Sequence, residues 1–395
     1  MLKLFTVSNI AAVLLLSACF ANTAPVSNND NDTGEDNTVL QVKAVTSIAP
    51  KIQAAILLDV SNSMDGLIDQ AKAQLWNMVS VMGKAKCDGI APQIEIALYE
   101  YGRETNDGNK GFVKQISPFT KDLDQLSKDL FSLTTNGGDE YCGHVMYSSL
   151  SELGWDTDSA NYKVIFIAGN EDFLQGDIHY TKACAIAKKE GVIINTIYCG
   201  NRMQGIQEHW NIMGECGGGS FTNINSDIKV EDIPTPYDSV LFSLNEKLNG
   251  TYIGYGSKGN EGFMNLQEAD NSNFVANKSA ALKRVSVKSK KVLYDNSSWD
   301  LVDAYTSDST VIAKIDTKTL PDSLKNKSKM QLQLLVNKKA QERSSIQKEI
   351  ENVNTQREMF IANAAKNNNG KEPNLQTEIE KIIRSQAAKY NMVIE

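Results

Sequence analysis

The sequence predicts a doubly wound α/β sheet over residues 51–226, followed by a mainly helical region over residues 227–395. Two observations predict this fold class. Several apolar runs are continuous instead of alternating, which indicates strands buried on both faces, as in a parallel sheet. Helical periodicities separate these runs, and strands that alternate with helices over about 175 residues are typical of doubly wound sheets.

The apolar runs predict the strands one by one. The first covers 54–58 and ends at Asp59, and the others cover 94–99, 164–167, 192–198 and, as a short last strand, 221–224. A weaker edge strand is expected over 113–116. Helical spacing predicts helices over 67–82, 123–133, 181–189 and 206–213.

The C-terminal region shows helical periods throughout. Helices are expected over 240–248, 264–294, 327–364 and 375–389. In the third of these, the spacing of Ile346, Ile350, Val353 and Phe360 is too short for a coiled coil and predicts packing within the chain. The second half of 264–294 holds six bases and no acid, which indicates either a solvated face or contact with an acidic partner or an anionic membrane surface: Lys278, Lys283, Arg284, Lys288, Lys290 and Lys291.

The N-terminal sequence predicts where the protein is located in the cell. Residues 1–18 have one base, a short apolar run and small residues at the end, as in a secretory signal peptide. Leu16-Ser17-Ala18-Cys19 resembles a bacterial lipobox, so we expect lipidation of Cys19 and anchoring of the chain to a membrane. Ordinary cleavage, for instance after Ala21, is the alternative. The acidic, polar stretch 19–50 is expected to be a flexible tether.

Composition excludes some classes of function. The formal net charge of -8 argues against a nucleic-acid-binding protein, which would need a basic surface. The chain has 3 histidines, and they suggest no acid–base pair. His144 follows Cys142 by two residues, a spacing that does not place two side chains face to face on a helix. We therefore expect no enzyme.

One cluster does predict chemistry. Asp59, Ser61 and Ser63 follow the first buried strand in the pattern Asp-x-Ser-x-Ser. A carboxylate and two hydroxyls from one turn can converge on Mg²⁺, which prefers six oxygen ligands. The alternative is that a serine caps the helix that follows. Because ligand sites of doubly wound sheets lie at the carboxyl ends of strands, we favour the metal site, with the loops 136–140 and 168–171 supplying further oxygens.

The stretch from Ile56 to Met64 resembles the opening of a von Willebrand factor type A domain with its metal-ion-dependent adhesion site. The resemblance covers about residues 54–224 and implies a mostly parallel, six-stranded sheet flanked by helices. It also implies that Asp59, Ser61 and Ser63 hold a divalent cation, directly or through water. In that family a ligand carboxylate completes the metal's coordination, so the site binds a partner and does not catalyse.

The sequence departs from that family in two loops. Asp139 follows Gly137-Gly138 where the family has threonine, and Gly169 stands where it has aspartate. Asp139 and Glu171 are the replacement ligands that we expect. An added carboxylate would neutralise the cation, which would weaken its attraction for a ligand carboxylate or shift the preference from Mg²⁺ towards Ca²⁺; Mn²⁺ is a further candidate.

Five cysteines remain beside Cys19, at spacings that fit no zinc site. In an oxidising compartment we expect one or two disulfides, with Cys199 paired to Cys216 or to Cys184, and at least one thiol left over.

Taken together, these features predict a cell-envelope lipoprotein, on the outer membrane by preference. Its metal site would bind a protein partner. The alternative is a scaffolding protein with a degenerate site that acts through its helical region.

Overall fold

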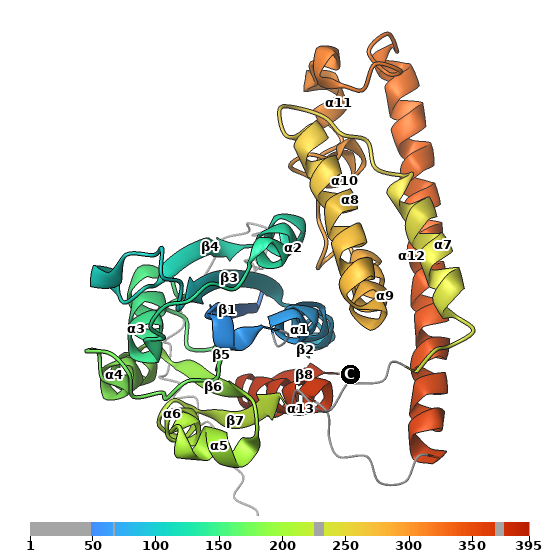
Figure 1. Ribbon diagram of the computed structural model, residues 1–395. Coiled ribbons are helices and arrows are strands. Elements are labelled where there is room, and N and C mark those ends of the chain that lie inside the picture. The colour runs from blue at the N-terminus through green and yellow to red at the C-terminus, as the bar shows by residue number, and fades with distance from the viewer. Residues whose placement is uncertain (1–48, 66–67, 225–232, 368–374, 395) are drawn as a thin grey trace, which may run out of the picture. The chain divides into compact units, whose positions relative to one another are not determined.

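The computed structural model describes residues 49–65, 68–224, 233–367 and 375–394 (Figure 1). Residues Ile48–Glu395 form one compact unit. The predicted signal peptide, Cys19 and nearly all of the predicted tether lie outside the described residues, and so does the predicted domain boundary at 226. Within the described residues, no helix is both long enough and apolar enough to cross a membrane.

The central sheet has six strands in the order β4-β3-β1-β5-β6-β7. All neighbours are parallel except β3 and β4, which are antiparallel. This confirms the doubly wound, mostly parallel sheet. The strands are β1 (Lys51–Asp59), β3 (Gln93–Tyr101), β4 (Lys114–Thr120), β5 (Tyr162–Gly169), β6 (Val192–Cys199) and β7 (Gly218–Ile224).

The pairing register brings the carboxyl ends of the central strands to one edge. Asp59 at the end of β1 is opposite Tyr101 on β3, and Leu58 is opposite Ala168 on β5. The loops that follow β1 and β5 therefore leave the sheet side by side, as expected for a ligand site in this fold class.

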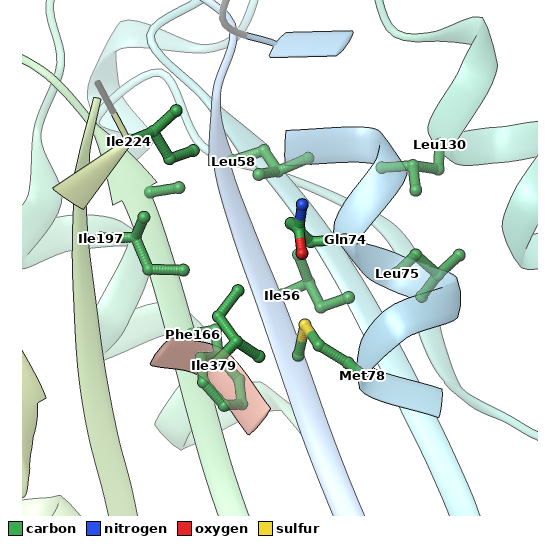
Figure 2. Close-up of a pocket in the computed structure, with 11 residues that line it drawn as sticks. Ile56, Leu58, Gln74, Leu75, Met78, Leu130, Phe166, Ile197, Ile224 and Ile379 are labelled. Atoms are coloured by element: carbon green, nitrogen blue, oxygen red, sulfur yellow. The ribbon is translucent and has the colours of Figure 1, made fainter. Parts of the chain in front are cut away.

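Helices cover both faces of the sheet. Along β1, Ile56 and Leu58 face one side, and Ala55 and Leu57 face the other. The first side is covered by α1 (Ile68–Met82), α2 (Leu123–Ser132) and α13 (Leu375–Ala387). Figure 2 shows a small apolar pocket between them, where Ile379 of α13 faces β1. The second side is covered by α3 (Cys142–Glu152), α4 (Tyr180–Glu190) and α6 (Trp210–Cys216), with the short α5 (Arg202–Gln207) before α6.

The C-terminal region is mainly helical, as predicted. It comprises α7 (Asp238–Asn249), α8 (Gly259–Ala276), α9 (Lys278–Lys288), α10 (Leu301–Ser307), α11 (Val311–Lys314), the 39-residue α12 (Lys329–Asn367) and α13. One short strand, β8 (Met392–Ile394), pairs antiparallel with β2 (Ala85–Cys87), a pairing that the sequence did not indicate.

The prediction of one helix over 264–294 is wrong. The backbone is extended at Asn277, between α8 and α9, and the Asn277 side chain accepts a hydrogen bond from the Ala280 amide at 2.8 Å. Asparagine favours such caps because its side chain replaces the missing helical acceptor. In α12, Ile350 is buried and Ile346 packs against the core, in line with the predicted packing within the chain.

Two of the six bases, both in α9, do not belong to a solvated face, whereas Lys278 and Lys291 are exposed. Arg284 is 1% exposed and Lys288 is fully buried. The Arg284 guanidinium binds Asp124 of α2 at 2.7 Å and Asp270 of α8 at 2.6 Å, and it lies over the ring of Trp76 of α1. The expected partner charges are thus inside the chain, because the helical region packs directly against α1 and α2 of the α/β unit.

Asp270 is the second centre of this ion cluster. It binds the Lys288 ammonium at 2.8 Å and accepts hydrogen bonds from the side-chain amides of Asn245 and Asn249. Burial alone would raise the pKa of Asp270, but the charges of Lys288 and Arg284 hold it well below its usual range. The Asp270 carboxylate therefore stays charged, whereas burial lowers the pKa of Lys288 to about 8.

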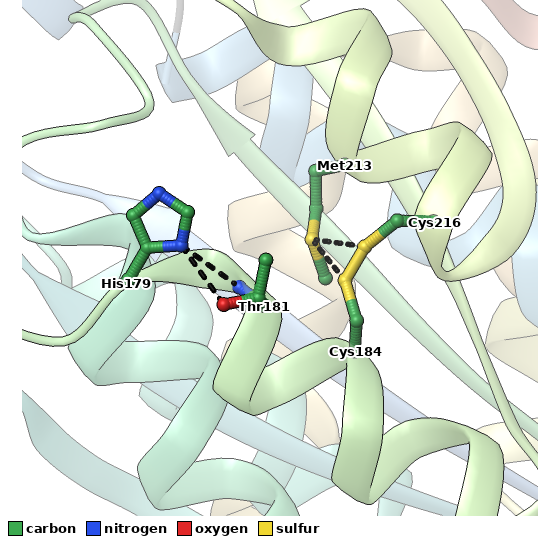
Figure 3. The surroundings of a disulfide bond; sticks show 5 residues. All are labelled: His179, Thr181, Cys184, Met213 and Cys216. Atoms are coloured by element: carbon green, nitrogen blue, oxygen red, sulfur yellow. Dashed lines mark hydrogen bonds between the residues drawn. A yellow bond between two sulfur atoms is a disulfide. The ribbon is translucent and has the colours of Figure 1, made fainter.

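The predicted disulfide is partly wrong. Cys184 of α4 is bonded to Cys216 of α6, with their Cα atoms 5.9 Å apart (Figure 3). Cys199 is a buried free thiol at the end of β6, on the opposite face of the sheet from this bond. Neighbouring strand ends suggested Cys199, but successive side chains of a strand point to opposite faces.

Removal of Asp124 tests the ion cluster. Asp124→Ala is expected to lower the free energy of unfolding by about 3–5 kcal/mol, because it removes the α2 carboxylate that is paired with the buried Arg284 charge. Urea unfolding of the full chain measures this. The control is Asp322→Ala, which removes the exposed pair with Lys325 and should leave the free energy of unfolding nearly unchanged. Equal losses in the two variants would contradict the role of the cluster.

Candidate metal centre

Asp59 is the buried centre of the predicted site. Its side chain is fully buried at the end of β1, and its Oδ1 atom accepts a hydrogen bond from the Ser61 amide at 2.8 Å. Its Oδ2 atom is buried and has no hydrogen-bond partner. An unsatisfied carboxylate oxygen inside a protein is costly, so Oδ2 marks a place for a further electropositive partner.

The two serine hydroxyls lie next to each other at this edge. Ser61 Oγ and Ser63 Oγ are 2.8 Å apart, and Ser63 Oγ donates to the Asn170 side chain at 2.8 Å. Asn170 in turn donates to the Ser63 carbonyl at 3.1 Å, which ties the loop after β5 to the loop after β1. The alternative of helix capping is not adopted by Ser61, since its side chain makes no cap hydrogen bond to the following 3-10 turn, Asn62–Met64.

Glu140 is the loop carboxylate that the structure brings to Asp59. A Cβ atom added at Gly102 would lie 2.9 Å from Asp59 Oδ1 and 3.1 Å from Glu140 Cγ, so both side chains converge on this glycine. The glycine has a φ of +81°, which disfavours any side chain there. Asp139, the residue we predicted, is exposed, and its carboxylate accepts a hydrogen bond from the Tyr141 hydroxyl at 3.1 Å.

Glu171 lies within electrostatic reach of both carboxylates. Burial, with the negative charge of Glu171, raises the pKa of Asp59 to about 6. Partial burial, with the charges of Asp59 and Glu171, raises the pKa of Glu140 to about 7. Three mutually repelling carboxylates at one edge are the electrostatic situation that a bound cation relieves.

Gly169 stands where the resemblance implies an aspartate, and the structure leaves no room for a side chain there. A Cβ atom at Gly169 would collide with the Tyr101 hydroxyl and would lie 3.1 Å from Asp59 Cβ. The Tyr101 hydroxyl is buried there and donates to the Ala168 carbonyl at 3.0 Å. Tyr101 therefore fills the space that an aspartate side chain at position 169 would need.

The donor set fits a hard divalent cation. Asp59 Oδ2, the two serine hydroxyls and the nearby Glu140 and Glu171 offer oxygen ligands only, which is the preference of Mg²⁺ and Ca²⁺. However, the described part of the chain has no group of three or more His, Cys, Asp or Glu side chains close enough to hold an ion together. Any ion here would depend on the serine hydroxyls and on water.

The sequence placed Asp59, Ser61 and Ser63 at the end of β1, where the structure has them, but it did not indicate all the residues around them. It indicated Asp59, Ser61, Ser63 and the two supplying loops, whereas Glu140 and Asn170 were not singled out. Adjacent residues in a loop point in different directions, so sequence spacing could not choose between Asp139 and Glu140. Nothing in the sequence indicated that Tyr101, which belongs to another strand, would lie beside Asp59 and Gly169.

Comparison with known proteins gives similarity of fold alone. No protein-family model matches the chain, and no curated protein matches its sequence. Among solved structures, proximal thread matrix protein 1 of the mussel byssus, with a zinc-occupied MIDAS motif, is 15% identical over 45% of this chain and 43% of its own, with a TM-score of 0.35. The match therefore spans less than half of the mussel protein.

Two bacterial structures are similar to the same extent. BatB from Bacteroides thetaiotaomicron is 13% identical over 44% of this chain and 90% of its own, with a TM-score of 0.34. A von Willebrand factor type A protein from Catenulispora acidiphila is 12% identical over 45% and 39%, with a TM-score of 0.33.

The unpaired charge of Asp59 predicts a pH effect on stability. An acid whose pKa is higher in the folded state destabilises the fold above that pKa, and the cost disappears as the pH falls through it. From pH 7 to pH 4, the metal-free chain should therefore gain up to about 3 kcal/mol of unfolding free energy relative to Asp59→Asn.

Urea unfolding with a chelator measures this difference at each pH. Asp139→Asn, which alters an exposed carboxylate of the same edge, is the matched control and should follow the wild-type curve. Parallel curves for the wild type and Asp59→Asn would show that the charge of Asp59 does not destabilise the fold.

By its strand order and pairing, the α/β unit has the mostly parallel six-stranded sheet of a von Willebrand factor type A domain.

Proposed function

We propose that the α/β unit binds a divalent cation through Asp59, Ser61 and Ser63, and a protein partner through that cation. The observation that carries this proposal is the buried, unpaired Asp59 Oδ2 beside the two hydroxyls, at the carboxyl edge of the sheet. Mg²⁺ is the first candidate, and Ca²⁺ and Mn²⁺ are the others. The partner would offer a carboxylate to complete the coordination.

The acidic loops refine this assignment. Glu140 and Glu171 would stabilise the cation as further ligands or through water, and Asp139 would act at the periphery. With this much negative charge nearby, a bound cation attracts a partner carboxylate less strongly. We therefore expect the site to hold its ion firmly and its partner weakly unless other contacts contribute.

Binding, and not catalysis, is the activity we propose. The two free thiols nearest the site are Cys142 and Cys199, and burial raises the pKa of both well above the usual range. A thiol that stays protonated is a poor nucleophile. His144 has a lowered pKa because of burial, and its ring lies at a tilt beside that of Tyr141, with the ring centroids 5.4 Å apart.

We further propose that the chain is a cell-envelope lipoprotein, anchored by Cys19 and favouring the outer membrane. Residues 1–18 would direct secretion, and residues 19–50 would hold the folded unit at a distance from the membrane. The Cys184–Cys216 disulfide supports an oxidising compartment.

A scaffolding protein with a degenerate site is the second candidate. It is favoured by the absence, in the residues that the structure describes, of a compact group of three metal-binding side chains. In that case the helical region would carry the interactions of the protein, and the metal titration below would show no uptake.

Calorimetric titration of Mg²⁺, Mn²⁺ and Ca²⁺ into the full chain tests the metal site. We expect uptake in the wild type and its loss in Asp59→Ala, because that variant removes the central carboxylate. Glu140→Gln should weaken binding by about tenfold or more, since it removes a negative charge beside the ion. Asp139→Asn, at the exposed neighbouring position, should have a smaller effect.

Acetate in the same titration tests the partner chemistry. Tighter cation binding with acetate would indicate a coordination position open to a carboxylate. The absence of uptake of any of the three cations, with and without acetate, would rule out the metal proposal. Normal uptake by Asp59→Ala would rule out the assigned ligand.

Lipidation is tested by expressing the chain in a Gram-negative bacterium fed with labelled palmitate. The wild type should carry label and sediment with membranes, and Cys19→Ser should lose both properties because the acyl chains provide the anchor. Label retained by Cys19→Ser would contradict the assignment, and so would an unlabelled wild type.

A further inference from the structure

A groove in the helical region has no role in the metal site. It lies between α7 and α8, with α9 as its floor, in the part of Figure 1 that holds these three helices. Both α7 and α8 pack against α9. The cavity measures about 600 Å³, which is within the range of small-molecule sites.

The charges at the floor of the groove balance, because the cations of Arg284 and Lys288 are paired with the carboxylates of Asp124 and Asp270. Neither cation is free to bind a ligand. Asp270 binds both Arg284 and Lys288 there, Arg284 is also paired with Asp124, and the side-chain oxygens of Asn245 and Asn249 accept hydrogen bonds from Lys288. The Arg284 guanidinium also donates to Asp124 and to the Leu266 carbonyl. Since these donors are used within the protein, the floor is unsuited to a phosphate or carboxylate ligand.

The walls offer neutral hydrogen-bonding groups and one exposed carboxylate, that of Glu246 on α7. Ser243 of α7 and Gln267 and Asn271 of α8 line the groove and are exposed, and within the described residues they make no hydrogen bond to the protein. Side-chain amides and hydroxyls can each donate and accept. The walls can therefore bind a ligand with many hydroxyl groups, because a hydroxyl also donates and accepts hydrogen bonds.

An aromatic pair provides the apolar surface. Phe242 of α7 and Phe274 of α8 meet edge to face across the groove, with ring centroids 5.1 Å apart. Phe274 is 45% exposed, so part of its ring is open to a ligand in the groove. An aromatic face with amides and hydroxyls on both walls matches a sugar ring, which has an apolar C–H face and a rim of hydroxyls.

We propose that this groove binds a neutral oligosaccharide. The Phe274 ring would pack against the C–H face of one sugar, while Ser243, Gln267 and Asn271 would bind its hydroxyls. The cations of the floor are already paired, and the Glu246 carboxylate on the wall repels anions, so the groove disfavours anionic ligands. This site is independent of the divalent-cation site, and neither needs the other to be occupied.

The test is calorimetry, with saturation-transfer NMR, on the full chain with chelator present, so that the metal site does not contribute. The probes are chitotetraose, cellotetraose and maltotetraose, with inorganic phosphate as the anionic control. At least one oligosaccharide should bind with a Kd of about 1 mM or tighter, and phosphate should not bind. Phe274→Ala and Asn271→Ala should each weaken that binding by about tenfold.

Phe360→Ala, which alters a half-exposed phenylalanine of α12 outside the groove, should leave the affinity unchanged. If Phe274→Ala does not fold, Asn271→Ala decides, since its exposed side chain supports no other residue. The proposal is overturned if no probe binds up to about 10 mM, if phosphate binds in their place, or if both groove variants bind as the wild type does.

Discussion

The buried Arg284 guanidinium holds the two parts of the folded unit together. It joins α9 to α2 through Asp124 and to α8 through Asp270, and it lies over Trp76 of α1. An arginine in this position needs both carboxylates, because burying an unpaired charge costs more free energy than the surrounding packing contacts contribute. The orientation of α8 and α9 against the α/β unit follows from this requirement. So does the floor of the groove, which is built from the same ions and is neutral for that reason.

The carboxyl edge of the sheet presents the opposite situation. There the carboxylates of Asp59 and Glu140 have no basic partner among the described residues, and burial together with mutual repulsion raises the pKa of both. A fold that satisfies its buried charges so completely around Arg284 would gain nothing by leaving Asp59 Oδ2 without a partner, unless that oxygen serves a ligand. The contrast between the two clusters is the physical basis for assigning a binding role to the edge and a structural role to the interior.

The variant features of the edge form a coherent set. Tyr101 occupies the space beside Asp59 that a side chain at Gly169 would need, and its hydroxyl is held by the Ala168 carbonyl. Asn170 then fixes Ser63 from the loop after β5. The loss of one carboxylate at position 169 is thus accompanied by a carboxylate from a different loop, at Glu140, and the oxygen-rich character of the edge is retained.

The sequence by itself determined the doubly wound sheet, the position of the cluster at the end of β1 and the helical nature of the C-terminal region, because hydrophobic periodicity and strand-end chemistry are local signals. Only the tertiary structure decided which acid of the loop meets Asp59, which cysteine pairs with Cys184, and where the bases of α9 point. Each of these depends on the direction of a side chain relative to a distant element. The break at Asn277 turned α9 so that Arg284 and Lys288 face α2 and α8, and their partners, far away in sequence, could not be read from the composition of the helix.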